Sequence, residues 1–193
     1  MSSVSSAALA TGSTRDQILG AARELITTRS YLGFSFQDVA DAVGIRKASL
    51  YHHFPSKEAL GVAVLRDAIQ GFRRWDEAKA RTPRESLDAY FRMYRNGLKA
   101  GSAVCPAGAL APGWGCTNEE LRLTVQELRE KQVLWLSGVL GALAPERFQG
   151  GGAAALAAYV FAVCQGALIA ARMTGRVEDF DDAVAQLRSS LPA

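Results

Sequence analysis

Apolar residues recur at helical spacing through most of the chain, and no stretch alternates between apolar and polar side chains as a half-buried strand does. The first helical segment is expected to run from Ser13 or Thr14, which can cap it, to about Thr28. One face of this segment carries Ile18, Leu19, Ala22, Leu25 and Ile26. The pattern predicts an all-α protein. Residues 1–12 lack a basic segment and a long apolar core, so we interpret them as a disordered leader and not as a signal peptide.

Two short helices are predicted after Gly33. Ser35 followed by Asp38 is typical of a capping box, and Gly44 can end the helix that begins there. A second helix is expected over about 47–53, before Pro55. Two short helices joined by a tight turn form a helix-turn-helix, whose second helix enters the major groove of DNA.

The polar positions around the second short helix favour a polyanion partner. The residues from Ile45 to Lys57 contain three basic side chains and no acidic one, and a carboxylate there would repel phosphate. The outward candidates are Arg46, Lys47, Ser49, Tyr51, His52 and His53. Simpler interpretations remain open, because Tyr51 could be a core aromatic and the basic pair could be a solvated face.

Later helices are predicted from their start and stop signals. Ser56 caps a helix to about Trp75, and Thr82 followed by Pro83 and Glu85 starts the next helix. Thr117 with Glu120 resembles another capping box, which starts a helix to about Leu143. Residues 101–116 are expected to form a loop or a short broken helix, residues 150–152 a linker, and residues 153–175 and 178–191 the last two helices.

The segment 153–171 contains no charged residue. It is nearly long enough to span a bilayer, but nine of its 19 residues are Ala, and Gln165 and Gly166 lie within it. A helix that is apolar all round is buried somewhere. We expect this helix to lie at a subunit interface, and we expect no membrane insertion.

Composition and charge exclude several classes of protein. With 193 residues, 49% hydrophobic and 21% charged, the chain is neither wholly disordered nor a disulfide scaffold. Three cysteines without a CxxC pattern and two adjacent histidines argue against a metal site and for a reducing compartment. The net charge is +3. Basic residues exceed acidic ones before residue 100, and the reverse holds after it.

The sequence lacks the motifs of the common enzyme classes. It has no Walker loop, nucleotide fingerprint, HExxH or GxSxG motif, and Gly150–Gly152 follows no strand. The acidic run Glu178, Asp179, Asp181 and Asp182 suits the start of a helix, where the dipole favours negative charge, better than a calcium loop. We predict no catalytic residues, no cofactor and no metal.

Residues 33–45, GFSFQDVADAVGI, and 48–60, ASLYHHFPSKEAL, resemble the signature of the TetR family of bacterial transcriptional regulators. The resemblance covers about residues 15–61, and Gln165–Arg172 is similar to the family's penultimate helix. It implies a helix-turn-helix DNA-binding domain over 13–61 and a helical ligand-binding and dimerisation domain over 62–193. In the implied homodimer, residues 153–174 and 178–191 form a four-helix bundle. Two recognition helices roughly 34 Å apart would bind a palindromic double-stranded operator.

The resemblance also implies roles for individual residues. Ser35 and Phe36 would lie near backbone phosphate, Lys57 would bind phosphate, and Tyr51 and His52 would contact phosphates or bases. Arg46, Lys47 and Ser49 would face bases or the adjoining backbone. The family often has a small cap residue and Gly where this sequence has Arg46 and Ala48, so the base preference does not carry over.

By the same resemblance, the C-terminal domain holds a pocket whose ligand weakens DNA binding. We expect an apolar or aromatic small molecule. The candidate lining residues are Phe91, Tyr94, Trp114, Trp135, Tyr159 and Met173, although aromatic residues at helical spacing ordinarily just pack in the core.

The function predicted from the sequence is therefore that of a cytoplasmic, ligand-responsive repressor. One alternative is a thiol-sensing regulator that uses Cys105 and Cys116, which lie in the Gly- and Pro-rich segment. Another is an architectural or accessory DNA-binding protein on the same fold. Activation in place of repression also stays open, because it depends on operator position.

Overall fold

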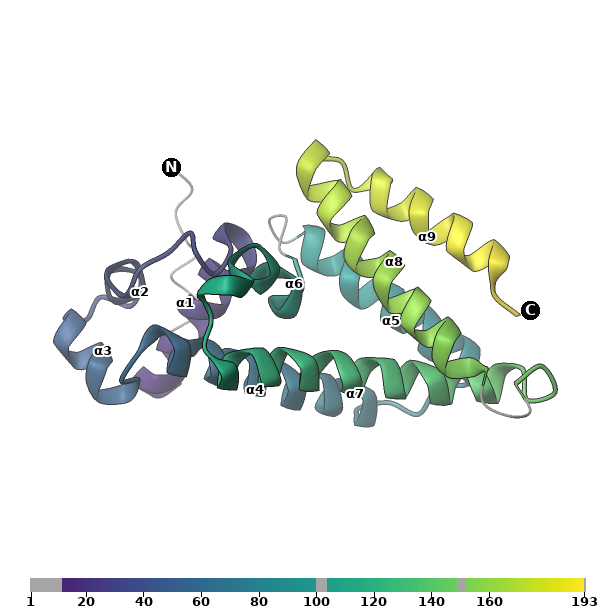
Figure 1. The fold of residues 1–193 in the computed structure, drawn as a ribbon, viewed down its shortest axis with the longest axis horizontal. Helices are drawn as coiled ribbons and strands as arrows, with labels where there is room; N and C mark the ends of the chain where they lie inside the picture. Colours follow the sequence, from purple (N-terminus) through teal and green to yellow (C-terminus); the bar gives the residue numbers. More distant parts are fainter. Residues whose placement is uncertain (1–11, 100–103, 149–151, 193) are drawn as a thin grey trace.

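The computed structural model describes residues 12–99, 104–148 and 152–192, and all regular structure within these ranges is helical. Figure 1 shows the first three helices at one end of the molecule, with α4 and α7 running lengthwise and α5, α8 and α9 at the other end. The all-α prediction is confirmed. The helices are α1 (Thr14–Arg29), α2 (Phe36–Val43), α3 (Lys47–His53), α4 (Lys57–Glu77), α5 (Pro83–Lys99), α6 (Pro106–Leu110), a 3₁₀ turn η1 (Ala111–Cys116), α7 (Glu119–Leu143), α8 (Ala153–Thr174) and α9 (Glu178–Ser190).

Local capping fixes the helix-turn-helix. The Ser35 backbone N–H donates to the Asp38 carboxylate over 2.7 Å, and the Asp38 N–H donates to the Ser35 hydroxyl over 3.3 Å. The Ser35 hydroxyl also donates to the Asp38 carboxylate, and the bonds from this hydroxyl and from the Ser35 N–H lower the pKa of the Asp38 carboxyl. Gly44 ends α2 with a φ of 76°, a conformation that glycine adopts without strain. Helix α3 begins at Lys47 although its N-cap, Arg46, makes no side-chain capping bond.

One predicted helix start needs correction. Helix α7 begins one residue later than the Thr117 capping box implies, because Asn118 is the N-cap and accepts the Leu121 N–H over 2.9 Å. The Thr117 hydroxyl instead donates to the Trp114 carbonyl over 2.8 Å. The broken helix expected within 101–116 is α6 followed by η1. Residues 1–11, 101–103 and 150–151 lie outside the described residues, so the expected leader and most of the linker do too.

The last two helices pack around α5 and α7. The inner face of α8 is buried through Ala157, Val160, Cys164 and Leu168. Helix α9 is held to α5 by two ion pairs, Arg95 with Asp181 through two contacts of 2.6 Å, and Arg188 with Asp88. Among the helices of the described residues, α8 has the length and the apolar composition that would allow it to cross a membrane, with a mean hydropathy of 1.9.

The N-terminal helices are tied to the rest of the chain at the C-terminal end of α1. The Thr27 carbonyl accepts the Val104 N–H over 3.2 Å, and the Tyr31 N–H donates to the Ala109 carbonyl over 3.2 Å. Arg172 of α8 donates to the same Thr27 carbonyl over 3.1 Å and to the carbonyl of Thr28. The domain boundary expected at 61/62 falls inside the continuous helix α4.

The turn between α1 and α2 requires glycine at position 33, because the backbone there lies close to the Arg29 carbonyl group. A Cβ atom there would lie 2.0 Å from the Arg29 carbonyl oxygen, whereas one at Gly115 would meet nothing within 4 Å. We expect Gly33→Ala to lower the free energy of unfolding by about 1–3 kcal/mol, the usual cost of forcing atoms into occupied space. Gly115→Ala serves as the control. Urea denaturation of both variants checks this, and equal stabilities would contradict it.

Candidate functional site

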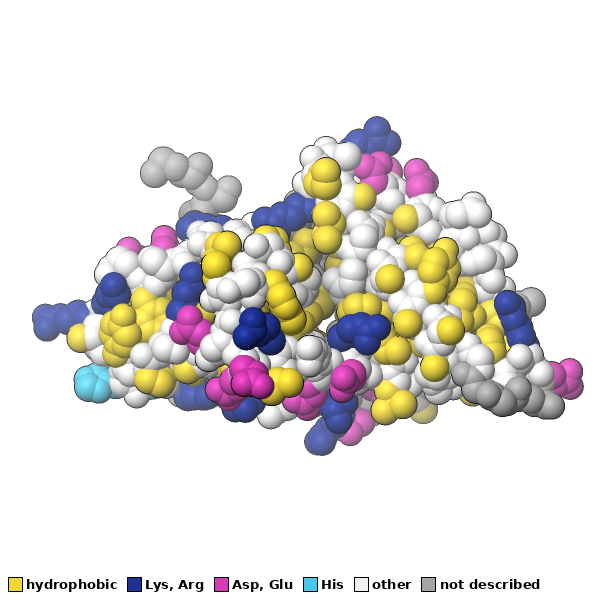
Figure 2. Space-filling view, viewed as in Figure 1, with side chains coloured by type: hydrophobic (Ala, Val, Ile, Leu, Met, Phe, Trp, Pro, Cys, Tyr) yellow, Lys and Arg dark blue, Asp and Glu magenta, His cyan; other side chains and the backbone are white. Residues whose placement is uncertain are grey.

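The surface of α3 is polar and basic. Arg46, Lys47, His52 and His53 are exposed, and Tyr51 exposes 49% of its side chain area. Figure 2 shows Lys, Arg and His side chains at the end of the molecule where α3 lies. Because no acidic residue occurs between Ile45 and Lys57, this surface suits a polyanion.

Phe36 and Tyr51 form an aromatic pair that joins α2 to α3. Their ring centroids lie 5.0 Å apart, and only 6% of Phe36 is exposed. The Phe36 side chain therefore supports the exposed Tyr51 and does not itself face outward. Phe36 is the first residue of α2, so at this position the backbone next to the exposed Ser35 is the part that can approach DNA. Ser49 is half-buried on α3.

The structure turns the Lys57 side chain inward. Its ammonium lies 4.2 Å from the ring centroid of Phe34 and 4.8 Å from that of Tyr31, and it donates to the Phe34 carbonyl. Burial lowers the pKa of this ammonium. The Lys57 ammonium therefore supports the turn between α1 and α2 in this conformation, and its expected role as a phosphate ligand stays a prediction.

A second feature is a cavity of about 350 Å³ in the C-terminal part of the molecule. It lies among α4, α5, α7, α8 and the residues that lead into α6. No charged side chain of the described residues lines it. The lining residues are Ala68, Gly71, Phe72, Trp75, Met93, Tyr94, Gly97, Val104, Cys105, Pro106, Leu128, Gln132 and Leu168.

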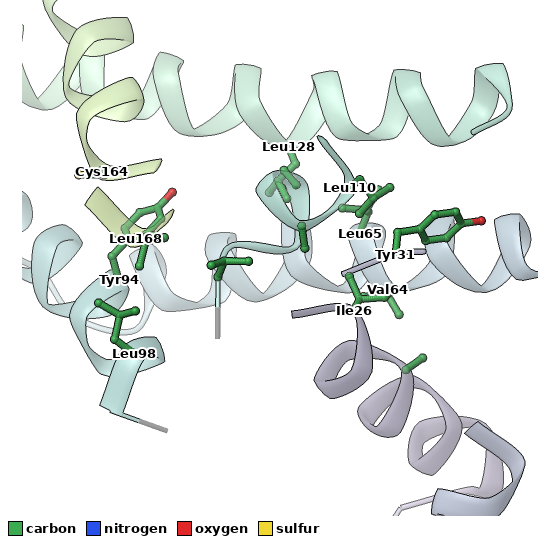
Figure 3. Packing of buried hydrophobic residues seen from close by; sticks show 14 of the residues in the cluster. Ile26, Tyr31, Val64, Leu65, Tyr94, Leu98, Leu110, Leu128, Cys164 and Leu168 are labelled. Carbon is green, nitrogen blue, oxygen red and sulfur yellow. The ribbon is translucent and has the colours of Figure 1, made fainter. Parts of the chain in front are cut away.

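One hydrogen-bond network crosses this apolar region. The hydroxyls of Tyr90 and Tyr94 donate to the Gln132 side chain carbonyl over 2.9 Å and 2.6 Å. The Gln165 amide donates to the Tyr94 hydroxyl over 3.0 Å. Burial raises the pKa of both tyrosines well above the ordinary value, so they remain neutral donors. In Figure 3, Tyr94 lies near Leu168 and Cys164 of α8.

Of the six lining residues proposed from the sequence, Tyr94 lies on this cavity. Phe91 instead lines a groove between α5 and α9, and Trp135 packs behind the cavity against Trp75, with ring centroids 5.5 Å apart. Trp114 lies in η1. Tyr159 and Met173 are on the outer face of α8, with 52% and 81% of their areas exposed.

Sequence reasoning missed several of the residues that do line the cavity. Ala68, Phe72 and Trp75 follow helical spacing on α4, which was a usable signal. Gln132 carried no such signal, because a single Gln within a long helix is ordinarily a surface residue.

The three cysteines have different environments. Cys105 is half-buried on the cavity wall, Cys116 is exposed in η1, and Cys164 is fully buried. Burial raises the pKa of the Cys164 thiol to about 12, which makes it inert. All three are free thiols.

Comparison with known proteins agrees with this geometry. Residues 18–64 match the model of a family described as bacterial regulatory proteins, tetR family. A crystal structure of a TetR family transcriptional regulator from Agrobacterium tumefaciens superposes with a TM-score of 0.83 at 30% identity. The match covers 94% of this chain and 98% of that one.

Two curated relatives are described as repressors. The HTH-type transcriptional repressor KstR2 of Mycolicibacterium smegmatis is 38% identical over 82 residues, 41% of this chain and 40% of the relative. The HTH-type transcriptional repressor NemR of Escherichia coli is 27% identical over 118 residues, 61% of this chain and 56% of the relative. These matches thus span about two fifths and just over half of the relatives' lengths.

Proposed function

The chain belongs to the TetR family of DNA-binding transcriptional regulators, and on that premise we propose that it is a cytoplasmic, homodimeric repressor released from a palindromic operator by a small apolar or aromatic molecule. Its family is one of regulators and not of enzymes. The observation that carries the proposal is the direct contact between the cavity wall and α1. Val104 lines the cavity, and its N–H binds the Thr27 carbonyl.

In this proposal α3 enters the major groove. Arg46, Lys47 and Ser49 at its start meet base edges or adjoining phosphates, and Tyr51 and His52 contact the DNA from the exposed face. Ser35 and the first backbone N–H groups of α2 approach phosphate, which helix N-termini favour. Phe36 keeps Tyr51 in place.

The proposed dimer forms through α8 and α9. The outer face of α8 is a stripe of small and apolar residues at helical spacing, which we call the α8 stripe and which is exposed in the single chain: Ala155, Tyr159, Ala162, Gly166, Ile169 and Met173. Figure 2 shows hydrophobic side chains on this part of the molecule. A second copy packed on the stripe would bury it and set the two α3 helices roughly 34 Å apart.

The proposed release mechanism depends on the cavity wall that also contacts α1. A molecule that fits the cavity presses on Val104, Cys105 and Pro106. Moving this segment changes the partners of the Thr27 carbonyl and hence the direction of α1, on which α2 and α3 are built. A ligand that binds this altered arrangement more tightly shifts the population away from the DNA-competent dimer.

Cys105 gives a second candidate function, regulation by thiol chemistry. Its half-buried position on the same wall supports this, because a modified thiol would fill the cavity as a ligand does. Cys116 is exposed but does not line the cavity.

The first test is binding of the purified protein to DNA that flanks its own gene, at a stated salt concentration, with and without a small-molecule library and thiol oxidants. We expect a specific footprint over a palindrome, released by one apolar compound. Release by oxidants alone, and its loss in Cys105→Ser, would favour the thiol mechanism. Salt-sensitive binding without any footprint would contradict the repressor and favour the accessory protein.

A pair of lysine variants separates DNA contact from support. Lys47→Met should weaken binding to all DNA and reduce the slope of log affinity against log salt by about one per protomer, since a phosphate contact is lost. Lys57→Met should leave that slope unchanged and lower the melting temperature, because it removes the cation from between two rings. Fluorescence anisotropy at several salt concentrations and thermal denaturation measure both effects. A slope change in Lys57→Met alone would reverse the assignment.

The dimer is tested by a charge on the α8 stripe. A Cβ at Gly166 meets nothing within 4 Å in the single chain, so Gly166→Glu leaves the fold intact but places a carboxylate in the proposed interface. We expect monomers in sedimentation and at least about a hundredfold loss of operator affinity, as burying unpaired charge is costly. Gly138→Glu, on an equally open position of α7, is the control. Ala167 is unsuitable because it is buried within the single chain. A dimeric Gly166→Glu protein would place the interface elsewhere.

A further inference from the structure

We propose that the effector is an uncharged aromatic molecule with one hydrogen-bond acceptor, such as a ketone, aldehyde or ester carbonyl, which accepts from the side chain amide of Gln132. This rests on the proposed function and narrows it to a chemical class. Three properties of the cavity carry it: its lack of charge, one unused polar group and its aromatic wall.

The absence of charge among the described lining residues disfavours ionised ligands. None of the described lining residues is Asp, Glu, Lys or Arg. Two ion pairs join α5 to α9, Arg95 with Asp181 and Arg188 with Asp88. A carboxylate or ammonium in this cavity would lose its hydration without gaining a counter-ion, which costs several kcal/mol.

The unused polar group is the Gln132 amide nitrogen. Gln132 lines the cavity, and its carbonyl oxygen accepts both tyrosine hydroxyls. This orientation gives each hydroxyl hydrogen an acceptor, and it leaves the two N–H donors of the amide without a hydrogen bond in the described chain. A cavity-lining N–H donor without an acceptor in the protein favours a ligand that supplies an acceptor over an isostere that lacks one.

The aromatic wall favours a flat ring. Phe72 and Trp75 are stacked with centroids 5.5 Å apart and planes 23° apart, and Trp135 closes behind both of them. Met93 supplies a flexible thioether on α5, a side chain that adapts to aromatic partners. The cavity of about 350 Å³ is at the small end of ligand sites, so it suits one or two fused rings.

Three matched probes test the class on the purified full chain. Acetophenone carries the carbonyl, α-methylstyrene replaces that oxygen with an isosteric CH₂ group, and benzoate replaces the methyl group with a negatively charged oxygen. Calorimetric titration should give acetophenone a dissociation constant about tenfold lower than that of α-methylstyrene, which corresponds to the 1.4 kcal/mol of one good hydrogen bond. Benzoate should give no heat of binding.

Two variants locate the site. Gln132→Leu should abolish the preference for acetophenone over α-methylstyrene while binding of the hydrocarbon persists. Ala68→Leu, which fills the cavity from α4, should abolish binding of both. The comparison of the three probes on the unmodified chain needs no variant, so it decides the class even where Gln132→Leu folds poorly.

Several outcomes would overturn the inference. Equal affinities for acetophenone and α-methylstyrene would remove the role of Gln132, and tight binding of benzoate would remove the charge argument. A lack of binding by all three, with a specific operator footprint intact, would reject this ligand class and leave the DNA-binding regulator standing. Acetophenone binding as expected, without any footprint, would keep the ligand class and reject the repressor.

Discussion

The carbonyl groups at the C-terminal end of α1 must find hydrogen-bond donors, because an α-helix leaves its last four carbonyls without partners of its own. In this protein the donors come from other parts of the chain. The Val104 N–H and the Arg172 guanidinium both bind the Thr27 carbonyl, and Arg172 also binds that of Thr28. The orientation of the N-terminal helices therefore depends on the segment before α6 and on α8.

This arrangement links three sites that lie apart in the sequence. Val104 belongs to the cavity wall, Arg172 lies on the helix that carries the α8 stripe, and Thr27 lies on the helix against which α2 packs. A charge-assisted hydrogen bond contributes about 1.5–3 kcal/mol, and effector coupling usually amounts to about 1–3 kcal/mol. In free energy, rearranging the donors around one carbonyl is thus enough for the proposed control of DNA binding by a ligand.

Features determined by neighbouring residues were predictable from the sequence, and those determined by packing were not. The capping box at Ser35 and the left-handed Gly44 were predicted because each acts within a few residues. The Thr117 start was wrong by one position because Asn118 competes for the same turn. Tyr159 and Met173 were assigned to a cavity because α8 is apolar on all sides, so its sequence does not indicate which face packs inward. Only contact with α5, α7 and α9 decides that.

The membrane-like hydropathy of α8 results from its having two apolar faces. Small residues on its inner face, Ala157, Ala167 and Ala171, are buried within the chain, and the α8 stripe forms the opposite face. A helix with a single apolar face would need only the chain's own core, whereas α8 has a second apolar face that the described chain leaves uncovered. Because α7 and α9 pack against α8 and still leave the stripe exposed, the stripe suits a partner of similar shape and polarity, such as the second α8 of the proposed dimer. The proposed dimer thus explains the apolar character that passes for a membrane span by length and composition, because α8 would be buried once in its own chain and once against its copy.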